Sequence, residues 1–309
     1  MKFKKITCLN WGGNELEDSY GSELDSLAEQ RVLATESDSK KHPETDVLLV
    51  KLGAKIGKEL IDSFPNLKYI GMLGTGYGGI DTKYAAQKGI TVTNIADYAT
   101  EGVAEFTLAI LLEHLRSVEK AKSQAKQGNY SDDFIGKEIK GKTFGVIGLG
   151  HIGLRTAELA KAFGANVIYW SHHRKKEAES KGIKYSENVL SSADIITVNL
   201  ALNSETENYL NADRVASIKR GAIVINPSPM ELFDFNTLVD RLKKGDITFI
   251  LDHSDEMTTE QLDVLKSIDN CIIYPPIAYL TSEASKLKKR IYIDNIKNFL
   301  AGKPSNKVN

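Results

Sequence analysis

The composition of this 309-residue chain excludes several classes of partner. Its 40 Lys and Arg balance 41 Asp and Glu, for a net charge of -1, so no large basic surface is available to attract nucleic acid or an anionic membrane. The apolar run near the basic N-terminal end is too short for a signal peptide, and no later stretch approaches a membrane span. We therefore expect a cytoplasmic protein, and the length favours two domains.

Short apolar runs bounded by turn residues predict β-strands at residues 6–9, 47–51, 69–72, 91–94, 143–147, 166–170, 195–199, 222–226, 248–252 and 271–274. Helical spacing is found between most of them, for example over residues 152–163. The longest apolar helix is expected at residues 103–118, with Thr100 as a possible N-cap, and it would connect two units. This alternation predicts an α/β fold with parallel sheets that helices cover on both faces.

The two cysteines and the histidines do not suggest a metal site. Cys8 and Cys271 are the only cysteines, and they show neither a CxxC spacing nor a nearby His at ligand spacing. We expect no metal site and no disulfide framework, and we interpret both cysteines as small buried hydrophobic residues.

A glycine-rich segment at residues 148–153 predicts a dinucleotide-binding βαβ unit. A predicted strand precedes it, a predicted helix follows at once, and a second strand completes the unit. The first glycine allows a tight turn, the second lets the backbone approach a diphosphate, and the third lets helix and strand pack closely. The cofactor-binding residues predicted here are Gly148, Gly150, His151, Ile152 and Gly153.

The residues after the second strand of this unit bear on the choice of dinucleotide. NAD sites usually carry an Asp or Glu there for the ribose 2′-hydroxyl. Here Ser171, His172, His173 and Arg174 follow, and no acid appears before Glu177. We therefore predict that NADP(H) is favoured over NAD(H), with the four residues near the 2′-phosphate. The alternative is a solvated basic turn beside an ordinary NAD site.

Several segments resemble the D-2-hydroxyacid dehydrogenase superfamily, which includes glycerate, phosphoglycerate and D-lactate dehydrogenases and glyoxylate reductases. The resemblance extends over nearly the whole chain. It is carried by the segments LGTGYGGID (73–81), GITVTN (89–94), GVAE (102–105), GKT (141–143) and NFLAGKP (298–304), together with the glycine motif.

The resemblance implies a discontinuous two-domain architecture. Residues 1–99 and 282–309 would form a flavodoxin-like substrate domain, and residues 100–281 an inserted Rossmann domain. A small anionic 2-oxo or 2-hydroxy acid would bind between them, its carboxylate held by backbone N–H groups of Leu73 and Gly74 and faced by Lys51. Dimerisation through the helix that starts near Gly102 is also implied, as a homodimer.

The same resemblance places further residues at the cofactor. Asp252 would lie where the family acid meets the nicotinamide carboxamide, and the backbone from Asn226 would lie at the ribose. Thr206, in the loop after a predicted strand, would complete this set.

Two replacements depart from the family pattern. Pro229 stands where the family has an Arg that binds and polarises the substrate, and Pro276 stands where it has the His that acts as general acid or base. The acid that orients this His aligns with Asp255, or with Glu256 after a slip of one residue. Proline has neither an ionisable group nor a backbone N–H. We therefore predict that ordinary dehydrogenase activity is absent or very weak.

Two other functions stay open at this point. One is an NADP(H)-dependent oxidoreductase with a rebuilt proton-transfer site, for which His253, Tyr98, Tyr274 and Tyr279 are weak candidates. The other is a non-catalytic protein that senses a dinucleotide or binds a partner. A structural protein without any ligand is disfavoured by the intact glycine motif.

Overall fold

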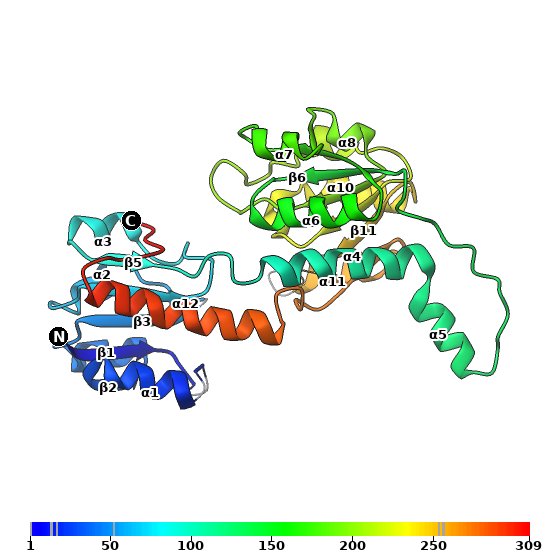
Figure 1. Ribbon diagram of the computed structural model, residues 1–309. Helices are drawn as coiled ribbons and strands as arrows, with labels where there is room; N and C mark the ends of the chain where they lie inside the picture. The colour runs from blue at the N-terminus through cyan, green and yellow to red at the C-terminus, as the bar shows by residue number, and fades with distance from the viewer. Residues whose placement is uncertain (1, 13–14, 17, 52, 253, 255–256) are drawn as a thin grey trace. The chain divides into compact units, whose positions relative to one another are not determined.

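The computed structural model describes residues 2–12, 15–16, 18–51, 53–252, 254 and 257–309. The chain forms two compact units (Figure 1). Residues Met1–Tyr98 and Ser282–Asn309 make up the terminal unit, and residues Ala99–Thr281 make up the inserted unit. The first boundary between the two units therefore lies one residue before the expected position.

The terminal unit is built on a five-stranded parallel sheet. Its strand order is β2-β1-β3-β4-β5, the order of flavodoxin-like sheets. Its strands are β1 (Phe3–Leu9), β2 (Ala28–Ala34), β3 (Val47–Lys51), β4 (Tyr69–Leu73) and β5 (Thr91–Thr93). Its helices are α1 (Asp18–Ser26), η1 (Glu36–Lys41), α2 (Lys58–Asp62), α3 (Thr82–Gln87) and α12 (Ser282–Leu300).

Two apolar clusters cover the two faces of this sheet. Alternate residues of a strand point to opposite faces, so Leu49 packs in one cluster and Leu48 in the other. The first cluster joins the sheet to α1 and α12 through Leu24 and Tyr292. The second joins it to α2 through Ile61 and also includes α3. The C-terminal helix α12 is therefore part of the core of a sheet whose strands all lie in the first third of the chain.

The inserted unit contains a seven-stranded parallel sheet of order β12-β11-β10-β9-β6-β7-β8, which is a Rossmann order with one more strand. Its strands are β6 (Thr143–Ile147), β7 (Asn166–Trp170), β8 (Lys184–Tyr185), β9 (Ile195–Val198), β10 (Ile223–Asn226), β11 (Thr248–Leu251) and β12 (Cys271–Ile273). Its helices are α4 (Thr100–Arg116), α5 (Val118–Lys126), α6 (His151–Ala162), α7 (Lys176–Ser180), α8 (Val189–Ser192), α9 (Ala212–Ala216), η2 (Met230–Leu232), α10 (Phe235–Lys243) and α11 (Thr259–Lys266).

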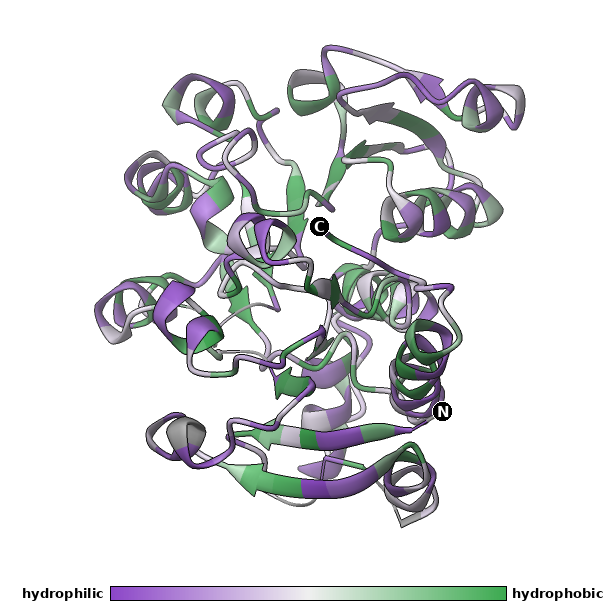
Figure 2. Cartoon of the chain, turned by 90° about the vertical axis from the view of Figure 1, so that its left-hand side faces the viewer, coloured by the Kyte–Doolittle hydropathy of each residue, from purple (hydrophilic) through white to green (hydrophobic). Residues whose placement is uncertain are grey.

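Helices cover both faces of this second sheet as well. Residues of α4 and α6, such as Leu111 and Ala157, pack on one face, and residues of α10 and α11, such as Leu238 and Leu265, pack on the other. Figure 2 shows hydrophobic segments in strands of both sheets, while the helices carry hydrophilic residues as well. The predicted α/β fold with parallel sheets covered on both faces is confirmed.

Three details of the predicted elements were wrong. Strands β2 and β8 were not predicted, and both lie at sheet edges, where one side of a strand has no neighbour and polar residues are tolerated. Thr100 is not the N-cap of α4, because the helix already begins at Thr100; Ala99 is the N-cap, with no side-chain cap hydrogen bond. The helix ends at Arg116 because Ser117 adopts a left-handed backbone with φ 50°.

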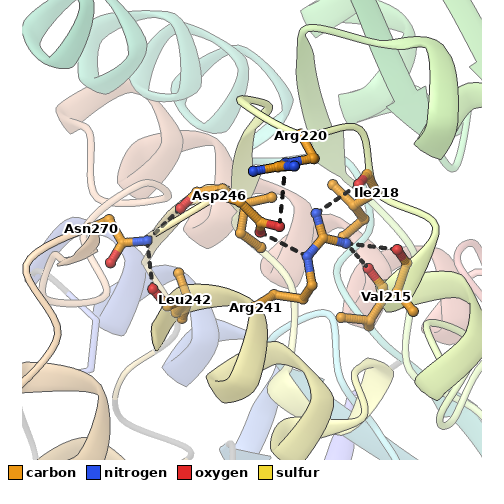
Figure 3. A network of polar contacts seen from close by, with 9 residues as sticks. Val215, Ile218, Arg220, Arg241, Leu242, Asp246 and Asn270 are labelled. Carbon is orange, nitrogen blue, oxygen red and sulfur yellow. Dashed lines mark hydrogen bonds and ion pairs between the residues drawn. The ribbon is translucent and has the colours of Figure 1, made fainter. Parts of the chain in front are cut away.

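A buried arginine connects three segments of the inserted unit (Figure 3). Arg241 on α10 is only 6% exposed. Its guanidinium donates to Asp246 Oδ1 at 2.8 Å and to the carbonyls of Val215, Ala216 and Ile218 at 2.8–2.9 Å. The planar group has five N–H donors, so one side chain satisfies a carboxylate and three carbonyls at the end of α9.

Neither cysteine has the environment of a reactive thiol. Cys8 is buried in β1 and Cys271 is half-buried in β12, and both are free. Burial raises the pKa of each thiol to about 12, so the nucleophilic thiolate is scarce near neutral pH. Among the helices of the described part of the chain, none combines the length and apolar character needed to span a membrane.

Candidate functional site

The glycine loop has the close backbone contacts that its sequence predicts. It connects β6 to α6, and Gly148 adopts φ 93°. A Cβ on Gly148 would lie 2.6 Å from the carbonyl oxygen of Asn199, and a Cβ on Gly153 would lie 2.0 Å from that of Gly148. Gly150 differs, since a Cβ there would meet no atom within 4 Å. The first and third glycines therefore serve packing inside the protein, whereas the second faces open space at the N-terminus of α6.

The loop lies where the strand order of the sheet reverses. Strands β6 and β9 are neighbours, and the chain leaves them in opposite directions along the sheet; ligands of open α/β sheets bind in this crevice at the carboxyl ends of the strands. Asn199, directly after β9, donates through Nδ2 to Thr197 Oγ1 at 3.2 Å. Its Oδ1 is buried with no hydrogen-bond partner among the described residues. The backbone of Asn199 lies against Gly148, the first glycine of the loop.

The segment after β7 has a fixed backbone and exposed basic side chains. The buried Ser171 hydroxyl donates to the His173 carbonyl at 2.6 Å, which closes the turn. His172 and His173 are exposed, with ring centroids 4.7 Å apart. Arg174 donates to both carboxylate oxygens of Glu179, at 3.0 and 2.9 Å, and this pairing raises the pKa of Arg174. The exposed arginine that was predicted to face a 2′-phosphate thus already has a carboxylate partner, the half-buried Glu179.

The other predicted cofactor residues have structural hydrogen bonds. The side-chain amide of Asn226 is fully buried. Its Nδ2 donates to the carbonyl of Ser228, and its Oδ1 accepts from the N–H of Ser228. Asp252, 3% exposed, accepts from the N–H groups of Ile277 and Ala278 at 3.1 and 3.2 Å. Thr206 donates to the carbonyl of Ala201 at 2.6 Å within its own loop. These side chains therefore stabilise the loops that follow β9, β10 and β11 through hydrogen bonds within the protein.

The two prolines lie beyond the carboxyl ends of β10 and β12, the two strands that flank β11 in the sheet. Pro229 follows β10 by three residues and is the N-cap of η2, with φ -56°. Pro276 follows β12, and the turn that contains it is held by the two hydrogen bonds to Asp252. Both prolines are half-buried. Neither position offers a donor or an acceptor side chain at this edge of the sheet.

The structure does not bring the weak candidates for proton transfer together among the residues that it describes. His253 and Asp255, as well as Glu256, lie outside the described residues. Tyr98 is the last residue of the terminal unit's first segment, and Tyr279 is exposed. Tyr274 directly precedes the two consecutive prolines and donates its phenol to the Glu113 carboxylate. Burial, with Glu119 as a lesser cause, raises the pKa of Glu113.

The terminal unit has its own site, at the carboxyl ends of its strands. Lys51 ends β3, and it is the register partner of Leu73, which ends β4. A cavity of about 350 Å³ opens here, lined by Glu15, Lys51, Leu73, Ser285, Lys288 and Lys289. The structure thus places Lys51 beside Leu73, with Gly74 as the next residue of the chain. It adds two lysines of α12 that were not predicted, because no sequence motif marks them.

Comparisons with known proteins agree with this geometry. Residues 108–278 match the profile of the D-isomer specific 2-hydroxyacid dehydrogenase, NAD binding domain. The chain is 34% identical over 282 residues to D-3-phosphoglycerate dehydrogenase of Methanocaldococcus jannaschii, covering 89% of this chain but only 54% of that protein. It is 33% identical over 264 residues to hydroxypyruvate reductase of Blautia hydrogenotrophica, covering 82% of this chain and 81% of the relative.

The solved structures extend the likeness to the whole chain. An acyclic imino acid reductase in complex with NADPH and D-Arg superposes with a TM-score of 0.86 at 27% identity, over 99% of this chain and 100% of that one. The matched profile covers more than half of the sequence, and the relatives align in both units. This chain therefore belongs to the D-isomer specific 2-hydroxyacid dehydrogenase family.

Proposed function

We propose that this protein binds NADP(H) in the inserted unit and a 2-oxo or 2-hydroxy acid in the terminal unit, with little or no ordinary dehydrogenase activity. The observation that carries the cofactor half is the open backbone at Gly150, at the start of α6 and at the reversal of strand order. A helix N-terminus with free N–H groups attracts a diphosphate. Ser171, His172, His173 and Arg174 would face the 2′-phosphate, and His151 and Ile152 would flank the diphosphate.

The acid would be held by the terminal unit. Lys51 and the backbone of Leu73 and Gly74 would bind its carboxylate, since Lys51 is the register neighbour of Leu73. When bound, the dinucleotide supplies or accepts a hydride at C4 of its nicotinamide. The chain must then provide the charge that polarises the substrate carbonyl and the proton that its oxygen takes up. Pro229 and Pro276 provide neither, which is the basis for weak activity.

A rebuilt proton-transfer site is the alternative. It is supported by one contact, the hydrogen bond from the Tyr274 phenol to Glu113, because a carboxyl with a raised pKa beside a phenol can relay a proton. Turnover of a 2-oxo acid that is lost in Tyr274→Phe, with dinucleotide binding unchanged, would favour this alternative. One similar structure is that of an acyclic imino acid reductase with NADPH. An acid with a C=N bond in place of the C=O bond is therefore a second substrate class to test for this alternative.

NADPH is expected to bind about tenfold or more tightly than NADH, because one charge-assisted hydrogen bond to the 2′-phosphate contributes about 1.5–3 kcal/mol. Trp11 and Trp170 are the two tryptophans, and Trp170 ends β7, where its carbonyl accepts from Gly148 N at 2.8 Å. Fluorescence of Trp170 in a Trp11→Phe background therefore reports binding. Arg174→Leu should remove much of the preference without changing the affinity for NADH, and Arg220→Leu should change neither. Equal affinities in the unmodified protein would refute the NADP(H) preference.

Gly150→Ala is expected to weaken NADPH binding by about tenfold or more, because the new methyl group would occupy the space that the diphosphate needs. The chain contains a matched control. Gly57 is likewise an N-cap glycine with extended backbone, and a Cβ added there would meet no atom within 4 Å, but it precedes α2 of the terminal unit. Gly57→Ala should lose the same small capping contribution and bind NADPH normally. Normal NADPH binding by folded Gly150→Ala would show that the diphosphate lies elsewhere.

A further inference from the structure

The cavity of the terminal unit lies at the point where the strand order of its sheet reverses, and no local sequence motif marks it. Strand β1 has neighbours β2 and β3, so the strand order reverses between β1 and β3, and ligands bind at such a reversal. Glu15 lies beyond the carboxyl end of β1, Lys51 ends β3, and Leu73 ends β4. All three line the cavity, together with residues from the first two turns of α12.

Charged groups line the cavity. Its described lining includes the ammonium groups of Lys51, Lys288 and Lys289 and the carboxylate of Glu15. Glu15 pairs with Lys51, with Nζ to Oε1 at 3.1 Å. Because Glu15 pairs with Lys51 on the side of the strand ends, it does not balance the ammonium group of Lys288 on the side of α12.

Lys288 places a cation on the α12 side of the cavity. Its side chain is half-buried, and its ammonium group lies 5.4 Å from the centroid of the Tyr98 ring. Burial lowers the pKa of Lys288, and among the described residues no carboxylate acts in the opposite direction. The ammonium group of Lys288 is partly desolvated, and an aromatic ring is a weaker partner for it than a carboxylate. An anion that binds beside Lys288 would therefore stabilise its charged form.

Ser285 adds a hydroxyl to the same side of the cavity. It precedes Lys288 by three residues and Lys289 by four in α12, and residues with these spacings share one face of a helix. The cavity therefore has two cationic sides: Lys51 at the strand ends, and the α12 face with Ser285 and Lys288.

We propose that the terminal unit selects a 2-oxo or 2-hydroxy acid with a second anionic group on its side chain, and that Lys288 binds this second group. The inference rests on the proposed function, in which Lys51 and the adjacent backbone take the C1 carboxylate. The second group is a carboxylate or a phosphate ester, since both accept hydrogen bonds from an ammonium and a hydroxyl group. Lys288 is thus a specificity-determining residue on the opposite side from Lys51.

Calorimetric titrations of the full chain with matched acids test this. The first pair of probes is 2-oxopentanoate and 2-oxoglutarate, which carries a carboxylate in place of the terminal methyl group. The second pair is hydroxypyruvate and phosphohydroxypyruvate. Here a monoanion is an acid with one anionic group, and a dianion is an acid with two anionic groups, whatever their total charge. At least one dianion should bind about tenfold or more tightly than its monoanionic counterpart. Lys288→Met should reduce this ratio to about threefold or less and leave the monoanion affinity unchanged. Lys51→Met should weaken both members of a pair alike.

Lys286→Met is the control, because Lys286 is exposed on the same helix and does not line the cavity. It should retain the preference for the dianion. The tighter of the two dianions identifies whether the second group is a carboxylate or a phosphate. Binding of monoanions and dianions with equal affinity, or a preference that survives Lys288→Met, overturns the inference and leaves the proposed function standing. Absence of binding by any acid, when NADPH still binds, overturns the substrate half of the proposed function as well.

Discussion

The double substitution Pro229→Arg and Pro276→His is expected to raise the rate of NADPH-dependent reduction of a bound 2-oxo acid by about 100-fold or more. A positioned general acid contributes about 10²–10⁴ in rate, and a cation that polarises the carbonyl adds to it. The backbone at Pro229, with φ -56°, suits any residue. The turn at Pro276 is held by hydrogen bonds from Ile277 and Ala278 to Asp252, which the substitution leaves in place.

Steady-state oxidation of NADPH with glyoxylate, hydroxypyruvate and 2-oxoglutarate measures the gain. The control is Pro229→Arg with Pro275→His, because Pro275 is the exposed neighbour of the half-buried Pro276. This control places an imidazole one residue away from the family position and should gain little. Rapid turnover by the unmodified protein would contradict the assignment of a disabled site. No gain in a folded double variant that still binds NADPH and the acid would favour the rebuilt site at Tyr274.

Arg241→Met is expected to destabilise the inserted unit by about 3–5 kcal/mol, as the loss of one partner of a buried ion pair usually does. The side chains of Arg241 and Asp246 are 8% and 16% exposed. Without the guanidinium, Asp246 keeps a poorly solvated charge, and each of three carbonyls loses one donor. Urea unfolding, followed by Trp170 fluorescence in a Trp11→Phe background, reports the inserted unit alone.

Arg220 provides the matched comparison (Figure 3). It lies 3.9 Å from the same Asp246 carboxylate, but its side chain is 87% exposed. Because exposed ion pairs contribute about 0–1 kcal/mol, Arg220→Met should lower the free energy of unfolding by no more than that. Equal losses in the two variants would mean that burial does not set the strength of this network.

Much of the fold could be predicted because its determinants are local. The buried strands of parallel sheets are short apolar runs, and they are recognisable wherever both faces of a strand are covered. Strand β2 was missed for the converse reason. It lies at an edge of the sheet and carries the polar residues Gln30 and Arg31 in its middle. It is therefore not a continuous apolar run. The two-residue β8, at the edge of the other sheet, carries too little pattern to be recognised.

The glycine loop was predictable because its glycines stand at positions where the local backbone leaves no room for a side chain or where a ligand would approach the backbone. Gly148 and Gly153 come within contact of backbone atoms that any Cβ would strike, and sequence spacing alone reveals such positions. Partners of polar side chains were harder to predict. The sequence showed Arg174 as a candidate for phosphate binding, but it did not show that Glu179 already binds its guanidinium.

By itself, then, the sequence determined the parallel α/β fold and the dinucleotide loop, and it is the basis for the proposed loss of two catalytic side chains at Pro229 and Pro276. These features depend on residue type and on short spacings. Only the tertiary structure decided that Lys288 shares a cavity with Lys51. The reason is that α12 returns from the far end of the chain to pack on the first sheet, and the side chains that meet in this way have no common sequence pattern.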